Sequence, residues 1–365
     1  MLALSRRRFI TLVGGSATAA CVRGAAAGGS APPEVPIHFI PREGIFWDHW
    51  LFRAPDKKYH LYYLYEPPGV AEALRRKSWC VGHATSTDLF AWEEGPVALR
   101  PGQDTWVDRG YATGSTIDFG GRYAMLVTGY SLSGGQGMAL AWSEDLDRWT
   151  VHGDGPLLSP PASGQWYETP DQMATNPPEC SGWCDPYLVR KSGEEAVYAV
   201  INGRVRDGDM YARGSFALAR TSDMVRWEML PPLFVPGFCT RCETAQLFTR
   251  GGRWYLIASM WPKLLTAEFK AQHPDGRYAA AALCWTAERF DGPYQLIGDW
   301  ALFPARSCYI CKVIEAPDYG DAILTIRQGR VHGRPAAGLS PAYRVSFPPE
   351  GGIRIQYDQT LGRKE

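Results

Sequence analysis

The order of apolar and polar residues predicts β-strands along almost the whole chain. Apolar or aromatic runs of strand length occur at residues 59–65, 123–130, 196–201 and 254–261. Each run precedes a stretch of similar sequence, at residues 82–92, 139–149, 217–227 and, more loosely, 282–294. Every such stretch reads as a strand, a polar turn and a second strand that opens with an aromatic residue. The pattern therefore predicts one β unit that recurs along the chain.

The turn of each unit has its own chemistry. In the first copy, Ser86 and Asp88 can hydrogen-bond the neighbouring backbone, and Trp92 then packs over the hairpin. Ser143 and Asp145 hold the same places in the second copy. Such units are long for a solenoid repeat and suit propeller blades with inserted loops.

A fifth unit is predicted from apolar runs at residues 322–326, 342–347 and 353–357. The expected fold is all-β, a single five-bladed β-propeller over residues 37–360 with a central active-site pocket. Two β-sandwiches are the alternative for a chain of 365 residues, but they would not explain four copies of one hairpin.

Composition narrows the classes of partner. The formal net charge is zero and no basic run follows the first few residues, which argues against nucleic acid and against an anionic membrane surface. The chain has 14 Trp and 18 Tyr, and this aromatic content suits stacking on sugar rings. Aromatic packing inside the blades explains the same content, so it does not by itself identify a ligand.

The start of the chain has the character of an export signal. Residues 1–30 contain the Arg6-Arg7 pair of a twin-arginine segment, followed by an apolar stretch that is too short to span a bilayer. Cys21 stands at a weak lipoprotein processing site, which would give a lipid anchor, and residues 31–36 form a proline-rich linker. The expected location is periplasmic, cell-surface or extracellular.

Cysteine usage leaves two interpretations open. Apart from Cys21, six cysteines form close pairs in the sequence, namely Cys180 and Cys184, Cys239 and Cys242, and Cys308 and Cys311. Disulfides are the ordinary interpretation in an oxidising compartment. Cys-x-x-Cys is also usual zinc spacing, so these six residues are the candidates for a structural metal site.

Three acidic residues recur at one place in the predicted blades. Asp48, Asp185 and Glu243 each stand where an apolar strand opens a blade. Because those entrances lie near the central channel of a propeller, the three side chains are expected to converge there. Glycoside cleavage uses such carboxyl groups, one to protonate the leaving oxygen and another to attack the sugar or activate water. Mutual repulsion would raise the pKa of at least one of them.

Residues close to these acids in sequence are the candidates for sugar binding. They are Trp47, His49, Trp50, Trp106, Asp108, Ser115, Trp183 and Arg241. Each of the aromatic residues could equally be packing, and Ser115 lies in a stretch of small residues that also fits a tight strand entry.

Several of these segments resemble glycoside hydrolase family 32, whose five-bladed relatives include families 68 and 43. The likeness rests on Trp47-Asp48, on residues 82–92, on residues 113–115 with Asp118, on Asp185-Pro186 and on Glu243. The resemblance implies Asp48 as nucleophile, Asp185 as stabiliser of the transition state and Glu243 as general acid/base, with no cofactor required. It also implies an oligosaccharide or polysaccharide substrate.

The chain departs from the family pattern near two of the acids. Cys184 stands where the family has an arginine, and Cys242 precedes Glu243 where the family has a cysteine after the acid. Ordinary sucrose or inulin specificity is therefore not implied. The leading expectation is a β-fructofuranosidase-like hydrolase that acts with retention. The alternatives are a family-43-like arabinofuranosidase or xylosidase that acts with inversion, and a carbohydrate-binding propeller without catalysis.

Overall fold

The fold is known from a computed structural model, which describes residues 36–70, 78–102, 105–272, 281–298, 302, 308–331 and 334–360. The predicted signal segment, Cys21 and residues 31–35 of the predicted linker lie outside these ranges. Residues Glu34–Glu365 form one compact unit. Within the described ranges, helices are short, and none has the length and apolar character needed to cross a membrane.

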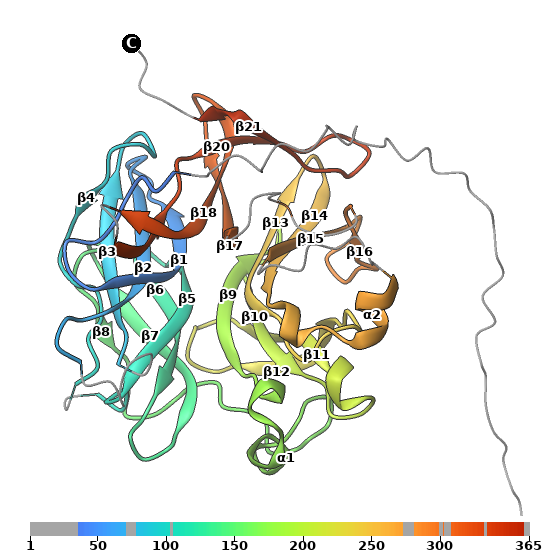
Figure 1. The fold of residues 1–365 in the computed structure, drawn as a ribbon. Helices are drawn as coiled ribbons and strands as arrows, with labels where there is room; N and C mark the ends of the chain where they lie inside the picture. The colour runs from blue at the N-terminus through green and yellow to red at the C-terminus, as the bar shows by residue number, and fades with distance from the viewer. Residues whose placement is uncertain are drawn as a thin grey trace, which may run out of the picture. The chain divides into compact units, whose positions relative to one another are not determined.

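The described residues form five antiparallel sheets, and these are the five blades of a β-propeller (Figure 1). The first blade contains β1 (Ile45–Arg53), β2 (Tyr59–Glu66), β3 (Cys80–Ser86) and β4 (Glu93–Glu94). The second contains β5 (Gly110–Phe119), β6 (Arg122–Tyr130), β7 (Gln136–Ser143) and β8 (Thr150–Val151). The third contains β9 (Cys184–Arg190), β10 (Val197–Arg204), β11 (Gly214–Thr221) and β12 (Glu228–Phe234). The fourth contains β13 (Glu243–Arg250), β14 (Arg253–Met260), β15 (Ala281–Ala287) and β16 (Gln295–Leu296).

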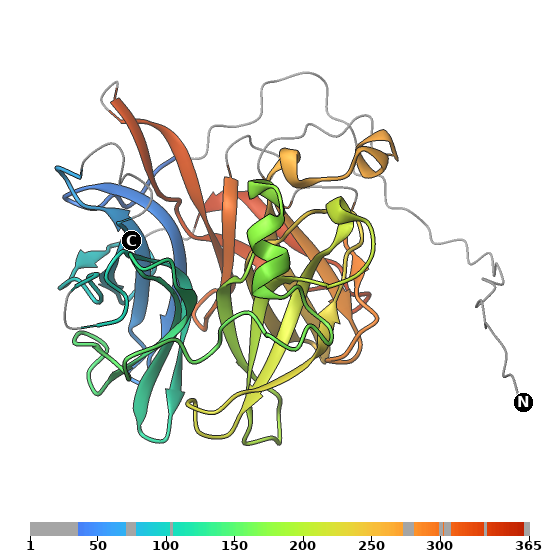
Figure 2. The ribbon, with the colours of Figure 1, turned by 90° about the horizontal axis from the view of Figure 1, so that it is seen from below.

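The fifth blade contains β17 (Cys308–Ala316), β18 (Gly320–Val331), β20 (Tyr343–Ser346) and β21 (Arg354–Thr360), with β19 (Arg334–Leu339) paired to β18. Residues before β1 join this blade, because the backbone N–H of His38 donates to the carbonyl of Leu339 at 2.7 Å. The described helices α1 (Pro170–Thr175) and α2 (Ala267–Gln272) lie outside the sheets (Figure 2).

The recurring hairpin is confirmed in atomic detail. In the first copy the Ser86 hydroxyl accepts the N–H of Leu89 at 2.9 Å, and Asp88 accepts the N–H of Phe90 at 2.8 Å. The same bonds recur around Ser143 and Asp145 and around Thr221 and Asp223. The residue after each aspartate has a positive φ, namely 63° at Leu89, 68° at Leu146 and 65° at Met224. The Ser/Thr-x-Asp sequence thus stabilises a turn that these residues would otherwise avoid.

Each inner strand carries a β-bulge near its start, and this feature positions the site. The pairing register shifts between Phe46 and His49 in β1, Tyr111 and Gly114 in β5, Cys184 and Tyr187 in β9, Glu243 and Gln246 in β13, and Cys308 and Cys311 in β17. Two residues of the inner strand oppose one residue of its partner at every shift. A bulge turns a side chain out of the regular alternation, and bulges are frequent next to active sites.

The inner strands meet around the hub of the propeller. β5 contacts both β1 and β9, β9 contacts β13, and β1 contacts β17. Side chains tie neighbouring blades together there: the Ser115 hydroxyl donates to the carbonyl of Pro186 at 3.0 Å and accepts the N–H of Leu188 at 2.7 Å. Repetition of one bulge around this ring brings equivalent positions of different blades towards a common centre.

Candidate functional site

The three predicted acids converge at the hub. Asp48 and Asp185 lie inside the bulges of β1 and β9, and Glu243 immediately precedes the bulge of β13. Each carboxyl group is close enough to another for repulsion to matter: Asp185 raises the pKa of Asp48, and both aspartates raise the pKa of Glu243. Carboxyl groups from three blades therefore share one site.

Asp48 is partly buried and has one described hydrogen-bond partner. The hydroxyl of Thr113, from the bulge of β5, donates to Asp48 Oδ2 at 2.8 Å. Burial, followed by repulsion from Asp185, raises the pKa of Asp48 to about 7, although the Thr113 bond opposes the rise. An aspartate with this pKa can be ionised near neutral pH and remain poorly solvated, which favours nucleophilic or basic behaviour.

Asp185 is held rigidly. Its Oδ2 accepts from Asn202 Nδ2 at 2.9 Å and from the backbone N–H of Thr244 at 3.1 Å. Its own N–H donates to the Thr128 hydroxyl at 2.8 Å. The backbone φ is 55° at Asp185 and 52° at Thr244, so both bulges place a non-glycine residue in the left-handed region. Burial raises the pKa of Asp185.

Glu243 is paired with an arginine from its own strand entry. Arg241 Nε and Nη2 lie 3.0 Å and 2.8 Å from Glu243 Oε1, and Arg241 Nη1 donates to the Ser181 carbonyl at 3.2 Å. Burial raises the pKa of Glu243 to about 7, although Arg241 opposes the rise. A carboxyl group that retains its proton near neutrality can protonate a leaving oxygen.

Arg241 is close enough to Cys184 for its charge to lower the pKa of that thiol, and Cys184 and Asp185 in turn favour the charged form of Arg241 by raising its pKa. Cys184 occupies the position where the resemblance implies an arginine. The guanidinium of Arg241, which precedes the first strand of the fourth blade, therefore supplies a positive charge near residue 184.

A buried lysine completes the site. Lys312, on β17, is 2% exposed, and its Nζ donates to the carbonyls of Thr244 at 2.7 Å and Ala245 at 3.2 Å. Its charge lowers the pKa of both Asp48 and Asp185. The sequence reasoning missed it because the fifth blade was predicted to begin at residue 322, after β17. The signal available was one lysine within the apolar run from Tyr309 to Ile314.

The predicted sugar contacts separate into two groups. Trp47, Trp106 and Arg241 are partly exposed, and Asp108 is exposed and accepts the N–H of Leu132 at 2.6 Å. The other four side chains are buried, at 0% exposure for His49, 1% for Trp50 and Trp183, and 3% for Ser115, and their contact with a sugar stays a prediction. The indole N–H of Trp50 donates to Thr116 and that of Trp183 to the Leu158 carbonyl, and both rings also belong to the packed core between blades.

The cysteine expectations are not met in the described parts of the chain. The cysteine side chains described there form no disulfide, and the Sγ atoms of Cys239 and Cys242 are 3.6 Å apart. Among the same residues, no group of three or more His, Cys, Asp or Glu side chains is arranged to hold a metal ion. Cys180, Cys184 and Cys311 therefore join no such group, and the side chain of Cys308 lies outside the description.

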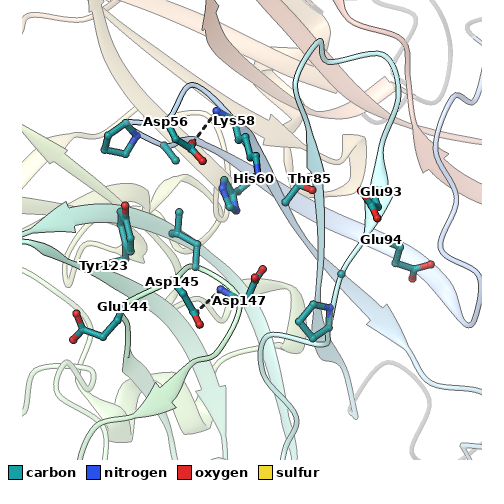
Figure 3. A pocket seen from close by; sticks show the side chains of 15 residues that line it. Asp56, Lys58, His60, Thr85, Glu93, Glu94, Tyr123, Glu144, Asp145 and Asp147 are labelled. Carbon is teal, nitrogen blue, oxygen red and sulfur yellow. Dashed lines mark hydrogen bonds between the residues drawn. The ribbon is translucent and has the colours of Figure 1, made fainter.

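A separate pocket lies where the hairpin turns of the first two blades approach each other (Figure 3). Its volume is about 480 Å³, and acidic side chains including Asp56, Glu93 and Asp145 line it. His60 Nδ1 lies 2.9 Å from His83 Nε2 at its wall. The pocket follows the end of β1, whereas Asp48 is near the start of that strand. It is therefore not part of the carboxylate site.

Comparison with known proteins gives the family. The model of the glycosyl hydrolases family 32 N-terminal domain matches residues 38–249, more than half of the chain. Sucrose-6-phosphate hydrolase of Escherichia coli is 31% identical over 213 residues, which are 58% of this chain and 40% of that protein. The corresponding hydrolase of Klebsiella pneumoniae is 27% identical over 198 residues, or 53% and 36%. The chain thus spans well under half the length of these relatives.

Solved structures agree in fold. The family 32 β-fructofuranosidase of Bombyx mori superposes with a TM-score of 0.66 at 19% identity, covering 88% of this chain and 65% of that one. An inulosucrase of Halalkalicoccus jeotgali gives a TM-score of 0.68 at 18% identity, with coverage of 89% and 90%. The family match, the repeated blades and the three converging acids agree: this chain belongs to glycosyl hydrolase family 32.

Proposed function

We propose that this protein is an exported glycoside hydrolase that cleaves a furanoside linkage, with β-fructofuranosidase-like activity and retention of configuration. One observation carries the proposal, the meeting of Asp48, Asp185 and Glu243 at the hub, where burial raises all three pKa values and the charge of Asp185 raises those of Asp48 and Glu243 further. Family membership supports the reaction class, and the named activities of the relatives support a fructoside as substrate.

The three acids divide the chemistry between them. Asp48 attacks the anomeric carbon while Glu243 gives its proton to the leaving oxygen, so that the glycosidic bond breaks as a glycosyl ester of Asp48 forms. Glu243, now ionised, takes a proton from water, and the resulting nucleophile releases the sugar and regenerates Asp48. These two steps need no oxidant, reductant or cofactor.

Asp185 is suited to hold the sugar rather than to react. Two N–H donors bind its Oδ2 and the Cys184 side chain is a further hydrogen-bond partner, which fixes the carboxylate. Each carboxylate oxygen has two acceptor positions, so a sugar hydroxyl can still donate to Asp185. Hydrogen bonds to a ring hydroxyl that strengthen in the transition state lower the barrier without covalent chemistry. Asp185 is thus a substrate-binding carboxylate whose position the Thr244 bulge determines.

The first experiment is a panel of substrates. The purified protein should hydrolyse at least one β-fructofuranoside among sucrose, inulin and levan, and aryl arabinofuranosides test the family-43-like alternative. Glu243→Gln protein should bind the same sugar without turnover. Sugar binding by both proteins, with no turnover of any furanoside by the wild type, would favour the non-catalytic propeller and contradict the proposal.

Export is the second part of the proposal and rests on residues 1–30 alone. Replacing Arg6 and Arg7 with lysine should retain the protein in the cytoplasm of its host, whereas the wild type should appear outside that compartment. If Cys21 carries a lipid, Cys21→Ala should release the exported protein from the membrane fraction. Equal cytoplasmic retention of the wild type would exclude a working signal.

The pH dependence follows from the acid pair. The pKa values of Asp48 and Glu243 are both raised to about 7, and the reactive form has Asp48 ionised and Glu243 protonated. Acidification protonates Asp48, and alkalinity removes the proton of Glu243. We therefore expect a bell-shaped profile of kcat/KM with its maximum near neutrality and limbs that fall about tenfold per pH unit. Initial rates between pH 4 and 10 measure it, and a flat profile would contradict the assignment.

Arg241 should control the alkaline limb. Its guanidinium lowers the pKa of Glu243, so Arg241→Met should raise that pKa and move the alkaline limb to higher pH by about one unit. Arg241→Lys retains the charge and should show a smaller displacement. The pH profiles of the three proteins provide the test, and an unchanged alkaline limb in the methionine variant would exclude this role.

A further inference from the structure

Lys312 is buried at the hub, and its ammonium group makes specific polar contacts that a residue used only for packing would not need. It is a fully buried ammonium at the hub, and the two carbonyls that it binds belong to the bulge of β13. Burying a charged side chain costs free energy unless specific contacts compensate for it. The compensating carbonyls come from Thr244 and Ala245, directly after the proposed acid Glu243.

The same bulge serves Asp185. The N–H of Thr244 donates to Asp185 Oδ2 while the carbonyl of Thr244 accepts from Lys312. One peptide segment therefore connects the buried cation to the sugar-binding carboxylate. Thr244 has a φ of 52°, which threonine rarely adopts, and contacts at both its N–H and its carbonyl stabilise that conformation.

In the described part of the chain, the titratable groups that interact with Lys312 come from three strands. Asp48 and His49 face it from β1, Asp185 and Tyr187 from β9, and Cys311 precedes it on β17. Burial, and next the charge of Lys312, lower the pKa of His49 to about 3, so His49 is neutral over the working range. The aspartates are therefore the anions that balance Lys312, whose own pKa burial lowers to about 8.

We propose that Lys312 is a positioning residue for the hydrolytic site: its buried ammonium fixes the Thr244–Ala245 bulge that orients Asp185, and it supplies the positive charge that faces Asp48 and Asp185 at the hub. This inference rests on the proposed function of Asp48 and Asp185. It adds a cation from the fifth blade, which the family match over residues 38–249 does not reach.

The chain offers a matched control for the structural part of this role. Gln246 also joins β13 to β17, since its Nε2 donates to the Val313 carbonyl at 2.7 Å and its Oε1 accepts the Val313 N–H at 2.7 Å. Gln246 is buried and uncharged. Gln246→Leu removes a tie between the same two strands without changing the charge at the hub.

The pH profile separates the electrostatic role from simple packing. Lys312→Met should move the acidic limb of kcat/KM to higher pH by about one unit, because Asp48 without the ammonium holds its proton more tightly. The rate at pH 5 should then fall about fivefold further than the rate at pH 8. Gln246→Leu should leave the acidic limb in place, even if it lowers the overall rate. Equal profiles for the two variants would overturn the proposal.

A second measurement does not depend on activity. Melting temperatures at pH 7.5 are compared for the wild type, Lys312→Met, Asp48→Asn and the double variant. The loss caused by Lys312→Met should be smaller in the Asp48→Asn background, because the uncompensated carboxylate is absent there. An equal loss in both backgrounds would overturn the charge role. If the wild type hydrolyses no furanoside but the coupling is present, the proposed function fails while the inference about charge stands.

Discussion

Asp48→Asn should reduce kcat on the best furanoside substrate by about 10⁴-fold, the scale seen when an enzyme loses a group that acts directly in covalent chemistry. The amide can still accept the Thr113 hydroxyl bond, so the geometry around residue 48 is retained. It cannot attack the anomeric carbon, and the reaction loses its covalent step. Steady-state rates with concentrated enzyme measure the loss, and a reduction below about tenfold would remove Asp48 from the nucleophile role.

The stability of the same variant is the control against unfolding. The folded protein raises the pKa of Asp48 from its ordinary value to about 7, mainly through burial. Below pH 4 the Asp48 carboxyl group is protonated in both the folded and the unfolded protein, so it does not change the free energy of unfolding. Between pH 4 and 7 the unfolded chain ionises first, so the folded state loses relative stability, by about 1.4 kcal/mol for each unit of pKa difference.

Asparagine carries no charge and avoids that loss. Asp48→Asn should therefore melt at a higher temperature than the wild type at pH 7 and at a similar temperature at pH 4. Thermal scans at the two pH values give the comparison. An inactive variant that is also more stable at neutral pH shows that the site holds its carboxylate at the expense of stability, as functional sites often do.

The sequence was informative wherever a side chain determines its own local structure. Ser86 and Asp88 predict their turn because both bonds are made within four residues, and the repeat of that turn predicts the blades. The acids were predictable for a related reason, since Asp48, Asp185 and Glu243 interrupt apolar strand entrances at equivalent places. Burying a carboxyl group costs free energy, so acids that recur at equivalent apolar positions indicated that these positions share a functional site.

Contacts between residues that are far apart in the sequence could not be predicted in the same way. Trp50 and Trp183 lie close to the acids in sequence, but their indoles pack between neighbouring blades, whereas the acids lie at the bulges near the hub. Lys312, in contrast, belongs to the site although it is far from the acids in sequence. It is 69 residues from Glu243 in sequence, and its partners are the carbonyls of Thr244 and Ala245, which carry no side-chain signal.

Glu243→Gln should affect the two chemical steps differently, and the difference tests retention. With a poor leaving group such as the glucose of sucrose, the variant lacks the proton donor and the rate should fall by about 10²- to 10⁴-fold. An aryl fructofuranoside with a strongly acidic phenol needs little protonation, so its bond cleavage should remain fast. Water must then attack without a general base. A glycosyl ester of Asp48 should therefore accumulate.

Rapid mixing of this variant with the aryl substrate should give a burst of phenol close to one equivalent of enzyme, and intact mass should increase by one glycosyl residue. Glu228→Gln is the matched control, because Glu228 also pairs with an arginine, Arg220, at 2.6 Å, on an exposed face of the third blade. That variant should retain wild-type rates and show no burst. An inverting enzyme forms no covalent intermediate, so the same experiment would show slow phenol release without a burst and would assign Asp48 as the base that activates water.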